Sequence, residues 1–186
     1  MRLARLDELH IIGGRIYAET ENLPKEEKKR KVADEIYEIL LLAYIFGQRR
    51  VSEDAQTDAQ KAYEAIYKKV AGETFEERVA RHIEEGTFTE DVLQRIIETD
   101  YHRVEETAAY ETAETVEAET GKKAYKRWLT MLDDRVRDAH WEIEGVEIPI
   151  NDLFYTADGE SARFPGDFGV ADLDCNCRCE LEYFFK

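Results

Sequence analysis

Apolar residues recur every three to four positions through most of the first 120 residues, and this spacing predicts α-helices. A first helix carries its apolar positions at Leu3, Leu6, Leu9, Ile12 and Ile16. The pair Gly13-Gly14 lies inside this segment. We expect it to weaken or bend the helix, because glycine is a poor helix former.

A second helix is expected to begin around Pro24 and to end at Gly47, because proline favours the first turn of a helix and glycine favours its end. Its apolar stripe comprises Val32, Ile36, Ile39, Leu40 and Ala43. Ser52 is expected to cap a third helix. The inward-facing positions of that helix are Ala59, Ala62, Tyr63, Ile66, Tyr67 and Val70.

Two threonine–glutamate pairs predict the next helix starts. Thr74 with Glu77 forms the sequence signature of a capping box, and the helix that it opens is expected to stop near Gly86. Thr87 with Glu90 repeats the signature. Residues 90–119 contain neither proline nor glycine, so we expect one long helix there.

After Gly121 the pattern changes to shorter segments that are richer in aromatic residues. We expect a strand over 122–132, a short helix over 133–140 capped by Asp133, a strand over 145–154, a loop over 155–172 and a strand over 175–185. The predicted fold class is therefore α+β. A helical body (1–121) with a long acidic helix precedes a small C-terminal module (122–186) that holds a few short strands.

The composition restricts the partners of this chain. Acidic residues outnumber basic ones 42 to 26, which gives a formal net charge of −16. A field of this sign repels phosphate backbones, so direct nucleic-acid binding is not expected. The longest apolar run, 39–46, is too short to cross a bilayer, so no membrane association is expected. The odd, clustered set of three cysteines is not a disulfide framework, which favours the cytoplasm.

Half of the net charge lies in the predicted long helix, where ten acidic residues face only Arg95 and Arg103. One interpretation is an acidic decoy that mimics DNA, and another is docking onto a basic partner. The ordinary interpretation is a solvated helix face, since charge runs are usually exposed. We favour the ordinary interpretation.

The C-terminal module concentrates the candidate chemistry. Asp134 and Arg137 are three apart, a favourable helical spacing, and His140 follows on the same face. On a strand, Cys175, Cys177 and Cys179 would point the same way. With His140 they would make a Cys₃His zinc set, although the C-x-C-x-C spacing is not that of a usual zinc knuckle. The alternative, three buried thiols that act as small apolar side chains, is the one that we favour, and no cofactor is expected.

The sequence gives less support for a catalytic site. The sequence has no G-x-S-x-G, H-E-x-x-H or phosphate-binding glycine loop. A Cys–His nucleophile pair could form from His140 with Cys177 or Cys179, so a nuclease or toxin-like enzyme that uses these residues and Arg137 stays as the alternative. We expect a protein that is not an enzyme.

The same residues also resemble the sequence motif of a known protein family. The motif W-x-x-x-x-D-x-R-x-R-x-x-H, the glycine and proline that follow it, and a closing N-C-R-C resemble the phage head morphogenesis domain, the Mu F-like minor head proteins of tailed phages and prophages. The matching positions are Trp128, Asp133, Asp134, Arg135, Arg137, His140, Gly145, Pro165, Asn176, Cys177, Arg178 and Cys179. Cys175 lies outside the family's pattern, which argues against the three-thiolate zinc site.

The resemblance implies a structural protein of the phage head. It implies assembly in the bacterial host cytoplasm, a final place in the interior of the virion head, and association with the portal vertex of the procapsid. The partners that it implies are the portal protein and other head proteins. Our hypothesis from the residues themselves is that the motif is structural, a folding nucleus of paired charges and buried thiols.

Overall fold

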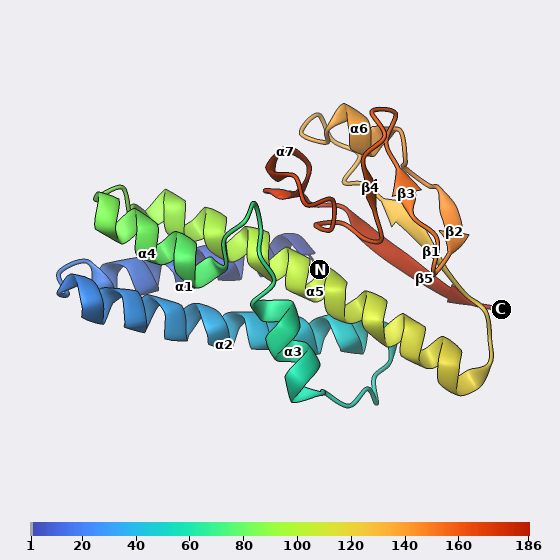
Figure 1. The fold of residues 1–186 in the computed structure, drawn as a ribbon, viewed down its shortest axis with the longest axis horizontal. Helices are drawn as coiled ribbons and strands as arrows, with labels where there is room; N and C mark the ends of the chain where they lie inside the picture. Colours follow the sequence, from blue (N-terminus) through green and yellow to red (C-terminus); the bar gives the residue numbers. More distant parts are fainter. Residues whose placement is uncertain (1) are drawn as a thin grey trace.

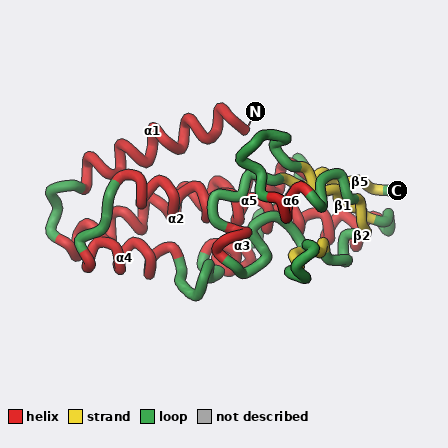
Figure 2. The backbone as a smooth tube through the Cα atoms, turned by 90° about the horizontal axis from the view of Figure 1, so that it is seen from above, coloured by secondary structure: helices red, strands yellow, loops and turns green. Residues whose placement is uncertain are grey.

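The computed structural model describes the backbone of residues 2–186 and the side chains of residues 7–186, so the predicted apolar positions Leu3 and Leu6 lie outside the described side chains. Five helices come first: α1 (Arg2–Thr20), α2 (Lys25–Val51), α3 (Ala59–Ile66), α4 (Phe75–Glu85) and α5 (Glu90–Thr120). They form an elongated helical layer, and the C-terminal module lies over one part of α5 (Figures 1 and 2). None of the described helices is long and apolar enough to cross a membrane. The α+β class is confirmed.

Helices α2 and α5 form the centre of the helical body, and the end predicted for α2 at Gly47 is wrong. The helix continues to Val51, and Gly47 is buried inside it. A Cβ atom at Gly47 would lie 2.1 Å from the backbone oxygen of Glu105 and 3.0 Å from Cβ of Ala108. This glycine therefore permits a close approach of α2 to α5, which is the reason for its presence within a helix.

Helix α1 also packs on α5, and the predicted bend is not found. Arg2–Thr20 is one helix that runs through Gly13 and Gly14. A Cβ atom at Gly13 would meet the side chain of Gln94 at 2.3 Å. The atom met is the end of a flexible side chain and not backbone, so this contact restricts the position less than the one at Gly47 does.

The start of α3 differs from the prediction. Asp58, not Ser52, caps this helix, and its carboxylate accepts the N–H groups of Gln60 and Lys61. Ser52 instead lies at the end of α2. Of the residues expected to face inward, Ala59 is exposed and Tyr63 is 51% exposed, whereas Ala65, which the pattern omitted, is buried.

The remaining helix ends are closer to expectation. The capping box of Thr74 and Glu77 is present, and α4 ends at Gly86 in the left-handed conformation, as predicted. Helix α5 is capped by Thr89 rather than by Thr87. It runs unbroken to Thr120 and ends at Gly121, which has a φ of 69°.

The acidic residues of α5 are not one solvated face. Asp100 and Glu106 are fully buried, and Glu105 is 8% exposed. Arg50 of α2 makes two bonds to Glu106, at 2.7 and 2.8 Å, and Asp100 pairs with Arg78 and Arg103. The favoured interpretation was wrong for these three acids, because arginines from neighbouring helices neutralise them in the interior.

The C-terminal module contains two small sheets. In the first, β1 (Ala124–Leu129) lies between β2 (Glu147–Pro149) and β5 (Glu180–Phe185), antiparallel to both. The second is a hairpin of β3 (Phe154–Tyr155) and β4 (Ser161–Ala162), and the short helices are α6 (Asp138–Trp141) and α7 (Ala171–Asp174). The strand expected over 145–154 is two separate short strands. The loop expected over 155–172 holds most of the hairpin and the start of α7.

The module packs onto α5 around a second apolar cluster. This cluster is centred on Trp128, which is fully buried, and it includes Tyr110 and Ala113 of α5. Strand β5 extends along α5 in the view of Figure 1. The apolar interior is therefore shared across the proposed boundary at 121/122, and that boundary stays a prediction.

Lys126 of β1 is a buried cation in this second cluster. Its side chain is fully buried, and its ammonium donates a hydrogen bond to the carbonyl oxygen of Arg163 at 2.9 Å. The ammonium also lies 4.9 Å from the ring centre of Tyr110 and 5.3 Å from that of Phe154. Burial lowers the pKa of Lys126 from its usual 10.5 to about 8.

Replacement of Lys126 by methionine is expected to stabilise the protein at pH 7, by about 1–2 kcal/mol, since it removes a charge that is costly to bury. Between pH 8 and 10.5 the lysine is neutral in the folded state but still protonated in the unfolded state. The stability of the wild type therefore rises over this window, and the advantage of the variant should shrink. Urea unfolding of both proteins at pH 7, 9 and 10 measures the difference in their free energies of unfolding. A difference that stays constant over this range would contradict the lowered pKa of Lys126.

Candidate functional site at the cysteine loop

The segment that carries the Asp-Arg-His motif is mostly a turn. The helix expected over 133–140 is wrong, because α6 begins only at Asp138. Asp133 accepts the N–H of Arg135 at 3.1 Å, so it caps a turn instead of a helix. Asp134 and Arg137 therefore do not share the helix face that their spacing predicted, and His140 alone of the three lies within α6.

The cysteine loop, residues 175–179, is not a strand. Strand β5 begins at Glu180, and Asn176 adopts the left-handed conformation with a φ of 54°. The chain turns there, so the predicted alternation of side chains fails. The guanidinium of Arg137 donates a hydrogen bond to the carbonyl oxygen of Cys175, which ties this loop to the start of α6.

Two of the three cysteines converge on His140. Its Nδ1 atom lies 3.4 Å from Sγ of Cys179 and 3.8 Å from Sγ of Cys177. All three side chains are buried, with exposures of 1–4%. Cys175 lies outside this group, so the predicted Cys₃His set is corrected to one histidine and two cysteines.

Cations and hydrogen bonds surround the two thiols. Hydrogen bonds from Cys179, and then from His102 and His140, hold the pKa of Cys177 well below its usual value against the opposing effect of burial. Arg178, between the two cysteines, binds the carboxylate of Asp133 through two bonds of 2.7 Å. This pairing lowers the pKa of Asp133. These contacts favour the thiolate form of Cys177.

Aromatic rings close the other side of His140. Phe168 stacks on the imidazole with ring centres 5.5 Å apart, and Trp128 contacts it edge-on at 5.6 Å. The motif glycine Gly145 has a φ of 72°, and its N–H donates to the carbonyl oxygen of Trp128 at 2.8 Å. Trp128 thus packs against His140, and Gly145 is hydrogen-bonded to the backbone of Trp128.

The motif proline lies further away and joins the module to the helical body. Pro165 is buried, and Gly166 follows it with a φ of 88°. A Cβ atom at Gly166 would lie 3.3 Å from Cβ of Arg103 on α5. The Pro165-Gly166 turn therefore belongs to the contact with α5 and not to the histidine site.

Sequence reasoning missed two residues near this site. His102 comes from α5 and hydrogen-bonds to Cys177, a pairing across distant segments that no spacing indicates. Asp174 is buried and accepts the N–H groups of Phe168 and Gly169 at 3.1 and 2.7 Å. Its position directly before the cysteine loop was the only signal for Asp174.

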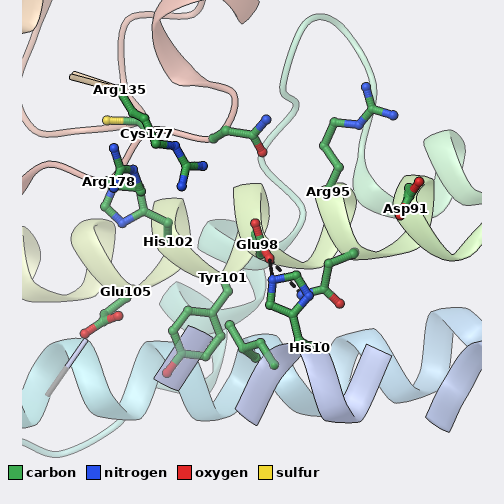
Figure 3. A pocket seen from close by; sticks show the side chains of 13 residues that line it. His10, Asp91, Arg95, Glu98, Tyr101, His102, Glu105, Arg135, Cys177 and Arg178 are labelled. Atoms are coloured by element: carbon green, nitrogen blue, oxygen red, sulfur yellow. Dashed lines mark hydrogen bonds and ion pairs between the residues drawn. The ribbon is translucent and has the colours of Figure 1, made fainter. Parts of the chain in front are cut away.

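A pocket of about 470 Å³ opens beside the site, between α1, α5 and the cysteine loop. Arg135, Cys177 and Arg178 reach it from the module, and His10 lies across from them, 3.0 Å from the carboxylate of Glu98 (Figure 3). His140 and Cys179 do not line this pocket. They border a separate hollow of only about 10 Å³.

Comparison with known proteins places this chain in a family. Residues 60–182 match the family described as Phage Mu protein F like protein. The match covers more than half of the chain and extends from α3 into β5. The chain belongs to this family. The resemblance inferred from the motif is thereby confirmed.

Two relatives match parts of this Mu F-like chain. Minor head protein GP7 of Bacillus phage SPP1 is 33% identical over 85 residues, which are 46% of this chain and 27% of GP7. NAD(+)--arginine ADP-ribosyltransferase EFV of Enterococcus faecalis is 43% identical over 61 residues, 33% of this chain and 12% of that protein. The chain thus spans about a quarter or less of the length of these relatives. No solved structure matches it.

The burial of the residues of this Mu F-like site can be compared with what an enzyme active site requires. An enzyme that used His140, Arg137 and the cysteines should gather them around an opening that a substrate can enter. Here His140, Cys177 and Cys179 are buried, and the larger pocket receives only Cys177 of the three. Arg137 is engaged with the backbone of the cysteine loop.

Proposed function

We propose that this chain is a minor head protein of a tailed phage or prophage, which acts through protein contacts at the portal vertex of the procapsid. The observation that carries the proposal is the set of bonds that the side chains of the family motif make. Its charged and thiol side chains bond to one another and to the backbone inside the module, as in the pairs of Asp133 with Arg178 and of Arg137 with Cys175. They stabilise a scaffold, and its outer surface is then free to make contacts.

The exposed apolar side chains support a contact role for the module. Of the large apolar residues exposed in the described part, six lie in the module: Leu132, Trp141, Val146, Leu153, Tyr155 and Val170. The helical body is about twice as long and has four. The module thus has the higher density of exposed apolar side chains, and such side chains are available for contacts with a partner protein.

The net charge fits a place in the head interior. A protein with a charge of −16 would not adhere to the packaged genome. Within this proposal the chain is made and assembled in the host cytoplasm, joins the portal protein and other head proteins, and remains in the virion head.

The experiment that tests the proposal is mass photometry of this chain mixed with the portal protein of the same phage or prophage. A portal ring that carries a discrete additional mass supports the proposal. The absence of a shift at low and at moderate salt would contradict portal binding, since exposed charge pairs are screened at the higher salt but should act at the lower.

Two exposed leucines, one in the module and one in the helical body, test which part of the chain contacts the portal protein. Leu132 of the module is 64% exposed, and Leu42 of α2 is 52% exposed. Leu132→Ser is expected to weaken portal binding about tenfold, by the loss of roughly 1.4 kcal/mol of apolar contact. Leu42→Ser is expected to leave it unchanged. Binding titrations with both variants measure this, and equal affinities would show that the module does not make the contact.

The two other functions are less well supported. A toxin-like or nuclease enzyme has the match to the ADP-ribosyltransferase, but that match covers only 12% of the relative. An acidic decoy of DNA needs an exposed acidic helix, whereas the acids in the middle of α5 are buried and paired with arginines. Neither alternative accounts for the burial of His140, Cys177 and Cys179.

A further inference from the structure

The cluster of His140, Cys177 and Cys179 has the composition and size of a metal site. Each residue offers one ligand atom, and the three atoms lie within 4.8 Å of one another. Zinc bonds of about 2.3 Å to sulfur and 2.0–2.1 Å to nitrogen, at tetrahedral angles, place sulfur and nitrogen about 3.6 Å apart. The observed distances of 3.4 and 3.8 Å lie on either side of that value.

Hydrogen bonding alone does not satisfy the polar atoms of the cluster. Nδ1 of His140 lies near both sulfurs, but it has a single lone pair and can accept a hydrogen bond from only one of them. An ion at the point where Nδ1 and the two sulfurs meet would bond all three ligand atoms at once.

The surroundings favour the ligand form of the cysteines. Arg178 lies beside both sulfurs, and its positive charge stabilises thiolates. The thiolate is the form of cysteine that binds metals. Two thiolates neutralise the double charge of a zinc ion, so no net charge would be buried.

We propose that His140, Cys177 and Cys179 bind a zinc ion in this protein, and that His102 provides the fourth ligand. His102 comes from α5 and hydrogen-bonds to Cys177. It is not among the ligand atoms that lie within 4.8 Å of one another, so its side chain must move toward the ion on binding. The ion would tie α5, α6 and the cysteine loop together. Any thiol that is protonated before binding releases its proton to the solvent. This proposal does not depend on the role in the phage head.

The first measurement is the zinc content of the untagged full-length chain, purified under reducing conditions and then exposed to one equivalent of zinc. We expect one zinc per chain. Replacement by cobalt should give the visible bands of a tetrahedral ion and a thiolate-to-cobalt band in the near ultraviolet. A folded wild-type protein without bound zinc and without these bands would overturn the proposal, as would a native disulfide between Cys177 and Cys179 seen as the loss of two hydrogens by mass spectrometry.

Cys175 provides a matched control, because it lies in the same loop but outside the cluster. Cys175→Ser should keep the metal, and Cys179→Ser should lose it. If Cys179→Ser does not fold, removal of zinc from the wild type by a chelator, followed by the melting temperature before and after zinc is restored, decides the question. A melting temperature unaffected by the chelator, or equal zinc loss in both variants, would contradict the site.

The fourth ligand has a separate test. His102→Ala should weaken zinc binding by a factor of at least about 10–100 and change the cobalt spectrum, while a portal-binding assay should be unaffected at saturating zinc. An unchanged affinity and spectrum would overturn the assignment of His102 and leave water in the fourth position.

Discussion

Gly47→Ala should destabilise the protein by about 3 kcal/mol, although the same change in the interior of an ordinary exposed helix stabilises it by up to about 1 kcal/mol. The added methyl group would lie 2.1 Å from the backbone oxygen of Glu105, a distance that no relaxed contact allows. Because the obstacle is backbone and not a flexible side chain, α2 and α5 must move apart and loosen the core between them. Thermal unfolding measures the change, which should be a fall of about 6–12 °C in the melting temperature.

Gly14→Ala is the matched control for this prediction. Gly14 also lies inside a helix, but a Cβ atom there would meet only the end of the Glu90 side chain, at 3.0 Å, and that side chain can rotate away. We expect Gly14→Ala to be neutral or mildly stabilising. If the two variants changed the melting temperature equally, the close approach of α2 and α5 would not be the reason for Gly47.

Asp100→Ala should cost about 3–5 kcal/mol, since it leaves a buried positive charge without its counter-ion. Arg103 is 2% exposed and donates to Asp100 at 3.1 Å. Its other bonds go to the carbonyl oxygens of Ala65 and Ile66 at the end of α3, and these cannot neutralise it. Urea unfolding should show the loss as a lower midpoint with a similar slope.

Two further variants distinguish the loss of the Asp100–Arg103 ion pair from the removal of one negative charge. Asp91→Ala removes an exposed acid from the same helix and should change stability by less than about 0.5 kcal/mol. The double variant Asp100→Ala/Arg103→Met should be more stable than Asp100→Ala, because the unpaired charge is gone. A double variant that is less stable than Asp100→Ala would show that Arg103 acts mainly through its bonds to α3.

The motif residues show where sequence reasoning succeeded and where it failed at the site. Spacing could not reveal that Cys177 and Cys179, but not Cys175, face His140, because the left-handed conformation of Asn176 breaks the alternation of a strand. The contact of His102 with Cys177 joins α5 to a loop near the end of the chain. Such a pair has no local signature, since it exists only when the module has packed on α5.

The sequence by itself determined the helices, the α+β class and the family. Apolar periodicity, the capping box of Thr74 and Glu77 and the left-handed Gly86 and Gly121 are local features, and they act within a few residues of the chain. The tertiary structure alone decided that Gly47 is a contact and not a helix end, and that Asp100 and Glu106 are buried. The physical reason is the same in each case. The group that gives the residue its role, such as the Glu105 backbone or the Arg50 guanidinium, comes from another helix.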